Sequence, residues 1–97
     1  MKNVVIFSAK WCTYCTPVKA ALGELKEEGL INLCIIDVDA ESDCTIFNNV
    51  YTGVQVAMDQ YGVRGLPTMV QLAEHGQYMG TKTGALSRVQ IMDWLGF

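Results

Sequence analysis

The sequence has few charged residues and no long apolar run, and each shortage excludes a class of protein. Only 18% of the 97 residues are charged and 51% are hydrophobic, so the chain is too apolar to be disordered. Its apolar stretches, such as Val4-Val5-Ile6-Phe7, are too short to span a membrane. Seven basic residues against ten acidic ones give a net charge of −3 and no basic surface. We therefore expect neither nucleic acid nor a membrane as a partner.

The start of the chain also lacks a recognisable export signal. Met1-Lys2-Asn3 leads directly into a strand-length run, without the small-residue cleavage pattern of a secretory peptide. We therefore expect a cytoplasmic location. A chain of 97 residues has room for one hydrophobic core, so we expect a single domain over residues 1–97 and a monomer.

The four cysteines could form a disulfide framework, a metal site or a redox pair. A framework is disfavoured without a secretory signal, and Cys34 lies inside a predicted strand, where zinc ligands are unusual. We expect no metal site. Cys12 and Cys15 instead have the C-x-x-C spacing of a redox pair. Cys34 fits a small core residue and Cys44 a loop cysteine, which could be bridged only if the following segment folds back over the strand.

The first half of the chain reads as strand, helix, strand. Residues Asn3 to Ser8 form a short β-branched and aromatic run, and Leu30 to Val38 form a second one. Between them, apolar residues recur at helical spacing from about Thr13 to Glu28, and Gly29 ends the helix. A strand–helix–strand unit of this length predicts two parallel strands with a right-handed crossover.

The second half predicts a helix, a hairpin and a final helix. The segment Cys44 to Tyr61 has the weakest secondary-structure pattern, and a helix is expected only in its second half, after a break near Asn48-Asn49. Thr68 to Ala73 and Gln77 to Thr83 are strand-like and are joined by a turn. Ser87 is expected to cap the last helix, with Gln90 completing a capping box. The order β-α-β-α-β-β-α indicates an α/β protein with a mixed sheet flanked by helices.

The predicted position of the C-x-x-C gives its two thiols different chemistry. Cys12 follows the first strand and faces the unpaired N–H groups at the start of the helix, which favour a thiolate. Cys12 is therefore the expected nucleophile. Cys15, three positions later, comes within disulfide reach and can attack a mixed disulfide to release the substrate.

Three segments, in order, resemble the signature segments of the thioredoxin family. They are Trp11-Cys12-Thr13-Tyr14-Cys15, Tyr61-Gly-Val-Arg-Gly-Leu-Pro67-Thr68 and Gly80-Thr-Lys-Thr-Gly84-Ala-Leu-Ser87. The resemblance implies a thioredoxin fold with a central mixed four-stranded sheet and a cis peptide bond between Leu66 and Pro67. It also implies a disulfide between Cys12 and Cys15 and an apolar substrate groove. The implied groove residues are Trp11, Thr13, Tyr14, Gly65, Leu66, Pro67, Gly84 and Ala85.

The chain departs from the family pattern in several places. It lacks the usual leading strand and helix, and it carries an insert over about residues 40–60. Where full-length thioredoxins have a buried aspartate and a facing lysine, the corresponding residues are Ile6 and Ile35, an apolar pair that can pack together. Thr13-Tyr14 replaces the Gly-Pro of thioredoxins between the cysteines and leans towards the Pro-Tyr of glutaredoxins.

The resemblance implies a thiol–disulfide oxidoreductase that reduces protein disulfides through Cys12 and Cys15 and needs no bound cofactor. Electrons would come from NADPH through thioredoxin reductase, or from glutathione in a glutaredoxin-like alternative. Ribonucleotide reductase is an expected client protein. The alternative from another class is a non-catalytic binding module built on the same fold.

Overall fold

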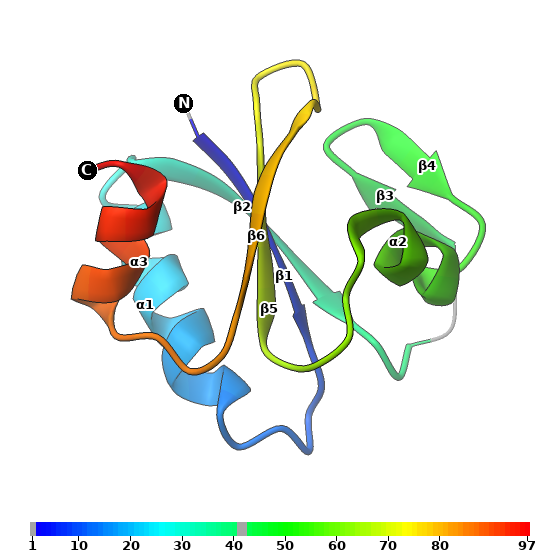
Figure 1. Ribbon diagram of the computed structural model, residues 1–97, viewed down its shortest axis with the longest axis horizontal. Coiled ribbons are helices and arrows are strands. Elements are labelled where there is room, and N and C mark those ends of the chain that lie inside the picture. Colours follow the sequence, from blue (N-terminus) through cyan, green and yellow to red (C-terminus); the bar gives the residue numbers. More distant parts are fainter. Residues whose placement is uncertain (1, 41–42) are drawn as a thin grey trace.

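The chain folds into a mixed sheet of four strands and a separate two-stranded hairpin (Figure 1). This computed structural model describes residues 2–40 and 43–97. The elements in chain order are β1 (Lys2–Ser8), α1 (Cys15–Glu27), β2 (Ile31–Asp37), β3 (Cys44–Ile46), β4 (Asn49–Tyr51), α2 (Val54–Tyr61), β5 (Thr68–Leu72), β6 (Tyr78–Thr83) and α3 (Arg88–Leu95).

The four-stranded sheet has the order β2-β1-β5-β6. β1 and β2 are parallel and are connected through α1, whereas β5 is antiparallel to both β1 and β6. The mixed α/β sheet predicted from the sequence is therefore confirmed. The predicted ends of the elements are shifted by one or two residues, most clearly at α1, which begins at Cys15 rather than near Thr13.

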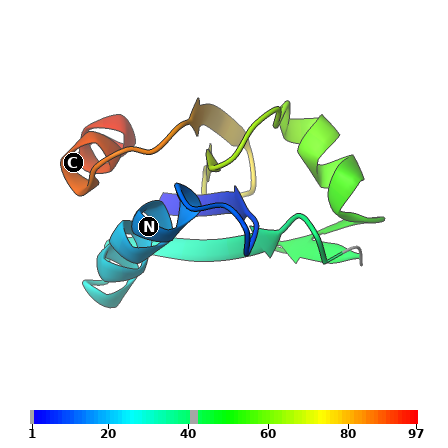
Figure 2. The same cartoon turned by 90° about the horizontal axis from the view of Figure 1, so that it is seen from below.

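The sheet is buried on both faces, which explains why β1 reads as an unbroken apolar run. Val4 and Ile6 pack with residues of α1 and α3 on one face, whereas Val5 and Phe7 pack with α2 on the other. All four side chains are fully buried. Figures 1 and 2 show α1 and α3 on one side of the sheet and α2 on the opposite side.

The β3–β4 hairpin is the element that the sequence did not predict. Its two strands have three residues each, and Phe47 and Asn48 connect them with positive φ angles of 44° and 74°. Two successive positive φ values are typical of the tight turn that joins hairpin strands. The break expected near Asn48 is thus the tip of a hairpin, which lies beside α2 in Figure 1. The turn between Asp37 and Asp43 includes residues outside the described part of the chain.

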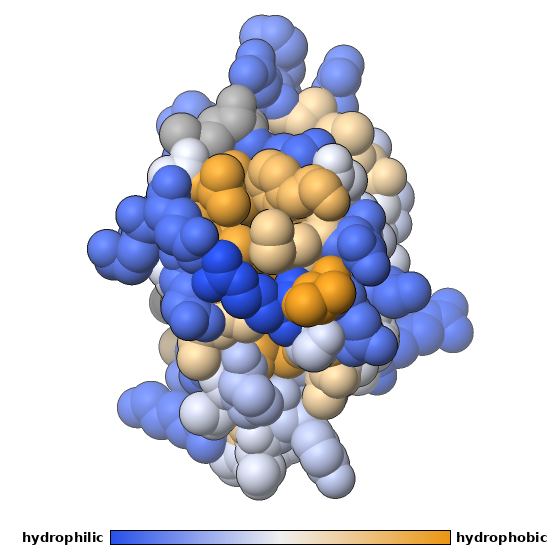
Figure 3. All heavy atoms as spheres, turned by 90° about the vertical axis from the view of Figure 1, so that its left-hand side faces the viewer, coloured by the Kyte–Doolittle hydropathy of each residue, from blue (hydrophilic) through white to orange (hydrophobic). Residues whose placement is uncertain are grey.

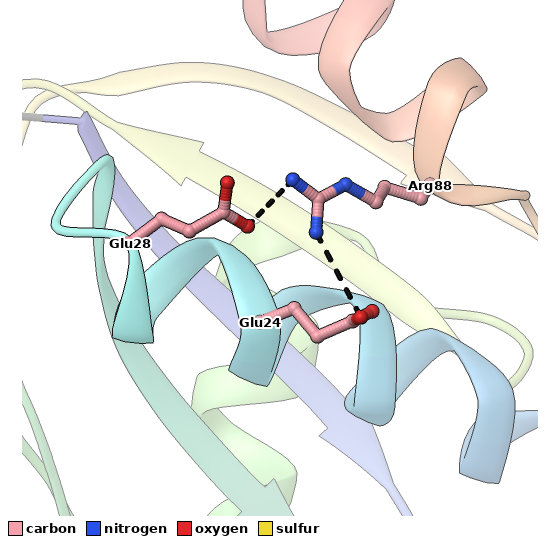
Figure 4. A network of polar contacts seen from close by, with 3 residues as sticks. All are labelled: Glu24, Glu28 and Arg88. Atoms are coloured by element: carbon pink, nitrogen blue, oxygen red, sulfur yellow. Dashed lines mark ion pairs between the residues drawn. The ribbon is translucent and has the colours of Figure 1, made fainter.

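The α1 and α3 helices are joined at the surface by an ion-pair network (Figure 4). Arg88, the first residue of α3, contacts Glu28 at 2.5 Å and Glu24 at 3.8 Å. Ser87 caps α3 as expected, because its side chain accepts from the Gln90 N–H and the Gln90 side chain accepts from the Ser87 N–H. This end of the last helix is therefore fixed by residues adjacent in sequence and by α1.

The outer surface of the molecule on the side of α1 and α3 carries both apolar and hydrophilic side chains. Figure 3 shows apolar side chains gathered near its middle, with hydrophilic side chains around them. Within the described ranges, the helices are all too short and insufficiently apolar to cross a membrane.

Candidate active site

The loop from residue 9 to 14 holds Cys12 at the carboxyl end of β1 and leads to Cys15, the first residue of α1. Two backbone hydrogen bonds between residues three apart shape it: the Cys12 N–H donates to the Ala9 carbonyl at 3.1 Å, and the Cys15 N–H donates to the Cys12 carbonyl at 3.2 Å. The second bond leads into α1, whose first residue is Cys15. In Figure 1 this loop lies at the end of the molecule opposite both termini.

Cys12 and Cys15 are paired as a disulfide. Their Cα atoms are 5.4 Å apart, a separation typical of disulfides. Cys12 keeps 6% of its surface exposed, whereas Cys15 is fully buried. Both pack with Ala9, and Val38 and Leu66 cover them from neighbouring segments. The two sulfurs therefore share an apolar environment but differ in their access to solvent.

Cys12 borders a cavity of about 550 Å³, which we call the active-site cavity. Its lining comes from the cysteine loop, the end of β2, α2 and the segment before β5. The lining residues are Trp11, Cys12, Thr13, Tyr14, Val38, Met58, Val63, Arg64, Gly65 and Leu66. Arg64 is the one charged residue among them. Cys15 is not part of the lining, so only the first sulfur of the pair faces the cavity.

Six of the ten site residues expected from the sequence line this cavity, namely Trp11, Cys12, Thr13, Tyr14, Gly65 and Leu66. The other four, Cys15, Pro67, Gly84 and Ala85, are outside its lining. Pro67 is buried and follows the lining residue Leu66 after a cis peptide bond. Gly84 lies next to Pro67, since its N–H donates to the Pro67 carbonyl at 3.0 Å. Ala85 is exposed beyond Gly84.

Four lining residues were not selected from the sequence. Val63 and Arg64 belong to the family segment that leads to Pro67, so that segment could have indicated them. Val38 and Met58 carry no such signal. Met58 lies on α2 and reaches the cavity only because this helix packs over the face of the sheet.

Trp11 is held in an exposed position by a side-chain hydrogen bond. Its indole is 68% exposed, and its Nε1 donates to Asp39 Oδ2 at 2.6 Å. Asp39 is oriented in turn, because its N–H donates to Asp37 Oδ1 at 2.9 Å. A bond to a carboxylate limits the rotation of the indole beside Cys12.

The residues at the positions of the family's buried charged pair are placed differently from our expectation. Ile6 and Ile35 are neighbours in the parallel register of β1 and β2. Ile6 is fully buried, but Ile35 is 52% exposed. The expected packing of Ile35 into an apolar pair was therefore wrong. Ile35 is on the outer strand β2, where the sheet gives it a neighbour on only one side.

The other two cysteines are free thiols that lie away from the active-site cavity. Burial raises the pKa of Cys34, and the nearby Cys44 raises it further. Burial also raises the pKa of Cys44, with an added contribution from Asp43. Within residues 2–40 and 43–97, no group of three or more histidine, cysteine or acidic side chains is arranged to hold a metal ion.

A disulfide at the start of a helix, with one sulfur at the edge of an apolar cavity, defines a dithiol–disulfide exchange site. The thioredoxin family model matches residues 1–96, and the chain belongs to this family. A thioredoxin of Pseudomonas aeruginosa is 30% identical over 94 residues, which cover 95% of this chain and 74% of that protein.

Two further relatives agree. Thiol-disulfide oxidoreductase ResA of Halalkalibacterium halodurans is 26% identical over 106 residues, covering 93% of this chain and 60% of ResA. The structure of a mutant thioredoxin from Halobacterium salinarum superposes with a TM-score of 0.74 at 27% identity. That match covers 96% of this chain and 70% of the other.

The protein is a thiol–disulfide oxidoreductase that reduces protein disulfides by exchange through Cys12 and Cys15. Membership of the family implies protein substrates that contain disulfides and a reductase that returns the oxidised pair to the dithiol.

Proposed function

We propose that Cys12 is the attacking thiol and Cys15 the resolving thiol of the exchange reaction. The observation that carries this assignment is the asymmetry of the pair, because Cys12 borders the active-site cavity and Cys15 is fully buried behind it. A substrate disulfide that enters the cavity can meet only the first sulfur. The start of α1 favours the thiolate form of a sulfur in front of it.

The exchange runs in two balanced steps. The Cys12 thiolate attacks one sulfur of the substrate disulfide, forming a mixed disulfide and releasing the other substrate sulfur as a thiolate. The Cys15 thiolate then attacks Cys12, which forms the intramolecular disulfide and releases the second substrate thiol. The substrate gains two electrons and two protons, and the protein loses them.

Cys15 must lose its proton before it attacks, and this chain has no carboxylate at the position of the buried aspartate of thioredoxins. Fully buried Ile6 occupies that position, and Cys15 packs against apolar residues. We assign the proton to water or to the departing substrate thiolate. Resolution rates that rise smoothly with pH would support this assignment, whereas a buried-carboxylate titration near neutral pH would contradict it.

The proposed substrate contact surface is the active-site cavity together with the backbone around the Leu66–Pro67 bond. Trp11, Thr13 and Tyr14 line it from the cysteine loop, and Gly65 and Leu66 line it from the segment before β5. An extended polypeptide can pair with backbone at such an edge. Pro67, Gly84 and Ala85 are outside the cavity lining, and we propose that they contribute to substrate contact through their backbone.

The proposed electron source is NADPH, delivered by a thioredoxin reductase, with no cofactor bound to this chain. We also propose a cytoplasmic, monomeric protein, as expected from the sequence. Ribonucleotide reductase is a proposed client. Reduction by glutathione is the second candidate, and Tyr14 before Cys15 favours it, since glutaredoxins carry tyrosine there.

Two experiments test these assignments. A Cys15→Ser variant should accumulate a mixed disulfide between Cys12 and the substrate, whereas Cys12→Ser should form none. A mixed disulfide trapped through Cys15 in the Cys12→Ser variant would reverse the roles. Insulin reduction driven by NADPH and thioredoxin reductase, measured beside glutathione with glutathione reductase, identifies the donor.

The binding-module alternative makes a different prediction for the same variant. A protein that only presents its groove to a partner should support its cellular role after Cys12→Ser. An oxidoreductase should lose that role, although the variant keeps the fold.

A further inference from the structure

The β3–β4 hairpin brings Cys44 back over β2, where Cys34 is located. The Cys34 thiol donates to the carbonyl oxygen of Thr45, the residue after Cys44, at a sulfur–oxygen distance of 3.9 Å. These residues come from strands of two different sheets. The contact therefore arises from the folding back of the segment over the sheet.

Both thiols point towards the same apolar cluster. Along β2, Cys34 lies on the face of Ile36, and along β3, Cys44 lies on the face of Ile46, because side chains two residues apart share a face. Ile36 and Ile46 are buried together, and both cysteines pack against the cluster that contains them. Two strands thus direct their thiols into one shared environment.

Both thiols are also close to a pair of tyrosine side chains, Tyr51 and Tyr61. The hydroxyls of Tyr51 and Tyr61 are hydrogen-bonded at 2.6 Å, and Tyr51 is the register partner of Cys44 in the hairpin. Burial raises the pKa of Tyr61, as do the bond to Tyr51 and the nearby Cys44 and Cys34 thiols. Both cysteines are therefore close enough to Tyr61 to influence the same hydroxyl.

We propose that Cys34 and Cys44 form a second oxidisable pair, whose disulfide fastens the β3–β4 hairpin to β2. The bond would join two sheets without replacing any ladder pairing, because in the described part of the chain the hairpin strands pair only with each other. An isolated two-stranded hairpin is marginally stable in water, so a covalent link has a clear structural effect. The proposal does not depend on which of Cys12 and Cys15 attacks substrate.

The oxidant is a small disulfide such as oxidised glutathione. One thiolate of the pair attacks it, forming a mixed disulfide and releasing one glutathione thiolate. The second thiolate attacks the protein sulfur of that mixed disulfide and releases the other glutathione. The pair loses two electrons and two protons, and one disulfide becomes two thiols. Since both pKa values are raised, few thiolates are present at neutral pH, and this pair reacts after Cys12 and Cys15.

The link would reach the active site through α2. The Cys44 thiol lies 4.0 Å from the carbonyl oxygen of Gly53, the residue before α2. Gly53 lines a second cavity, of about 240 Å³, together with Val38 and Met58, and these two residues also line the active-site cavity. Fastening Cys44 therefore fixes one wall of the region where substrate is proposed to bind.

The test oxidises the full chain carrying Cys12→Ser and Cys15→Ser with oxidised glutathione. We expect the loss of both remaining alkylation sites, a mass decrease of two hydrogen atoms, and a non-reduced peptide linking Cys34 to Cys44. Adding Cys44→Ser is the matched control, because Cys34 alone can form only a mixed disulfide with glutathione. Two thiols that stay alkylatable, or two glutathione adducts with no linked peptide, would overturn the proposal.

A second measurement uses the unaltered protein, in case the double variant folds poorly. Its fully oxidised form should yield two linked peptides, Cys12 to Cys15 and Cys34 to Cys44. Amide hydrogen exchange over residues 44–51 should slow when the second link forms, and it should not slow in a Cys44→Ser variant. Unchanged exchange in a protein that carries the link would contradict the fastening of the hairpin.

Discussion

The two cysteine pairs of this chain lie in contrasting settings. Cys12 and Cys15 are three residues apart at the start of a helix, and their loop is fixed by local backbone hydrogen bonds. Cys34 and Cys44 are brought near each other by a hairpin that is separate from the main sheet. The first pair depends on local geometry and the second on tertiary packing.

This difference separates their expected chemistry. Cys12 borders the active-site cavity, where we propose that it attacks substrate as a thiolate favoured by the start of α1. The second pair is packed against apolar side chains, and burial raises the pKa of both thiols. We therefore expect rapid exchange at the first pair and slower oxidation at the second.

The largest expected effect is the loss of activity when the first pair is broken. Cys12→Ser should reduce insulin-disulfide reduction to the uncatalysed background, because no other thiol borders the active-site cavity. Cys34→Ser, the matched control, should retain activity within about twofold, an effect below about 0.5 kcal/mol in the barrier. Equal losses in both variants would mean that the two pairs are functionally coupled.

The hairpin should prove to be part of the core in spite of its separate pairing. Ile46 is fully buried, so Ile46→Ala should lower the free energy of unfolding by about 2 to 5 kcal/mol in urea denaturation. Val50, 73% exposed on the same hairpin, is the control, and Val50→Ala should change stability by less than about 0.5 kcal/mol. A small effect for Ile46→Ala would show that the hairpin packs loosely.

The second pair should titrate above the ordinary range of a thiol. A raised pKa means that the thiolate appears only at higher pH, so iodoacetamide labelling of Cys34 and Cys44 should rise at higher pH in the folded protein than in the urea-unfolded chain. The measurement is the pH midpoint of the labelling rate for each residue by mass spectrometry. Coincident midpoints in the two states would contradict the environment described for this pair.

The hydrogen bond of Trp11 should have a moderate effect on the first pair. Asp39→Ala removes the acceptor of the indole N–H and should raise the KM for a disulfide substrate about two- to tenfold, corresponding to about 0.5 to 1.5 kcal/mol. Asp39→Asn keeps an oxygen acceptor and should recover part of the loss. Asp93→Ala on α3 removes the same charge elsewhere, and an equal rise in KM there would indicate a general charge effect.

The smallest effect is expected at the surface network between α1 and α3. Arg88→Ala should lower the free energy of unfolding by about 0.2 to 1 kcal/mol, because its partners are solvent-accessible carboxylates. The difference should shrink in high salt, where surface charges are screened. A larger, salt-independent loss would point to packing by the aliphatic part of the arginine.

Much of the fold could be predicted because its signals are local. The apolar run of β1, the helical periodicity of α1 and the capping box at Ser87 each depend on residues close in sequence, and each appears in the structure. The hairpin was missed because its strands have only three residues. Its turn is made by Phe47 and Asn48 without a glycine, so the usual signal of a tight turn is absent.

In the active site, too, local sequence signals identified some residues and missed those that depend on packing. The C-x-x-C and the segment that leads to Pro67 identified residues on two walls of the active-site cavity. Met58 could not be identified, since its side chain reaches the cavity only through the packing of α2 on the sheet. Ile35 was misjudged for a related reason, because its exposure depends on β2 being the outer strand.

Local sequence patterns are enough to give the order of the main elements, the spacing of the redox pair and the difference between its first and second cysteine. These depend on periodicity and on helix-end geometry, which act within a few residues. The side chains that surround Cys12, and the position of Cys44 relative to Cys34, depend instead on how distant segments pack. Contacts between segments distant in the chain are set by the simultaneous packing of both faces of the sheet, and no local pattern encodes them.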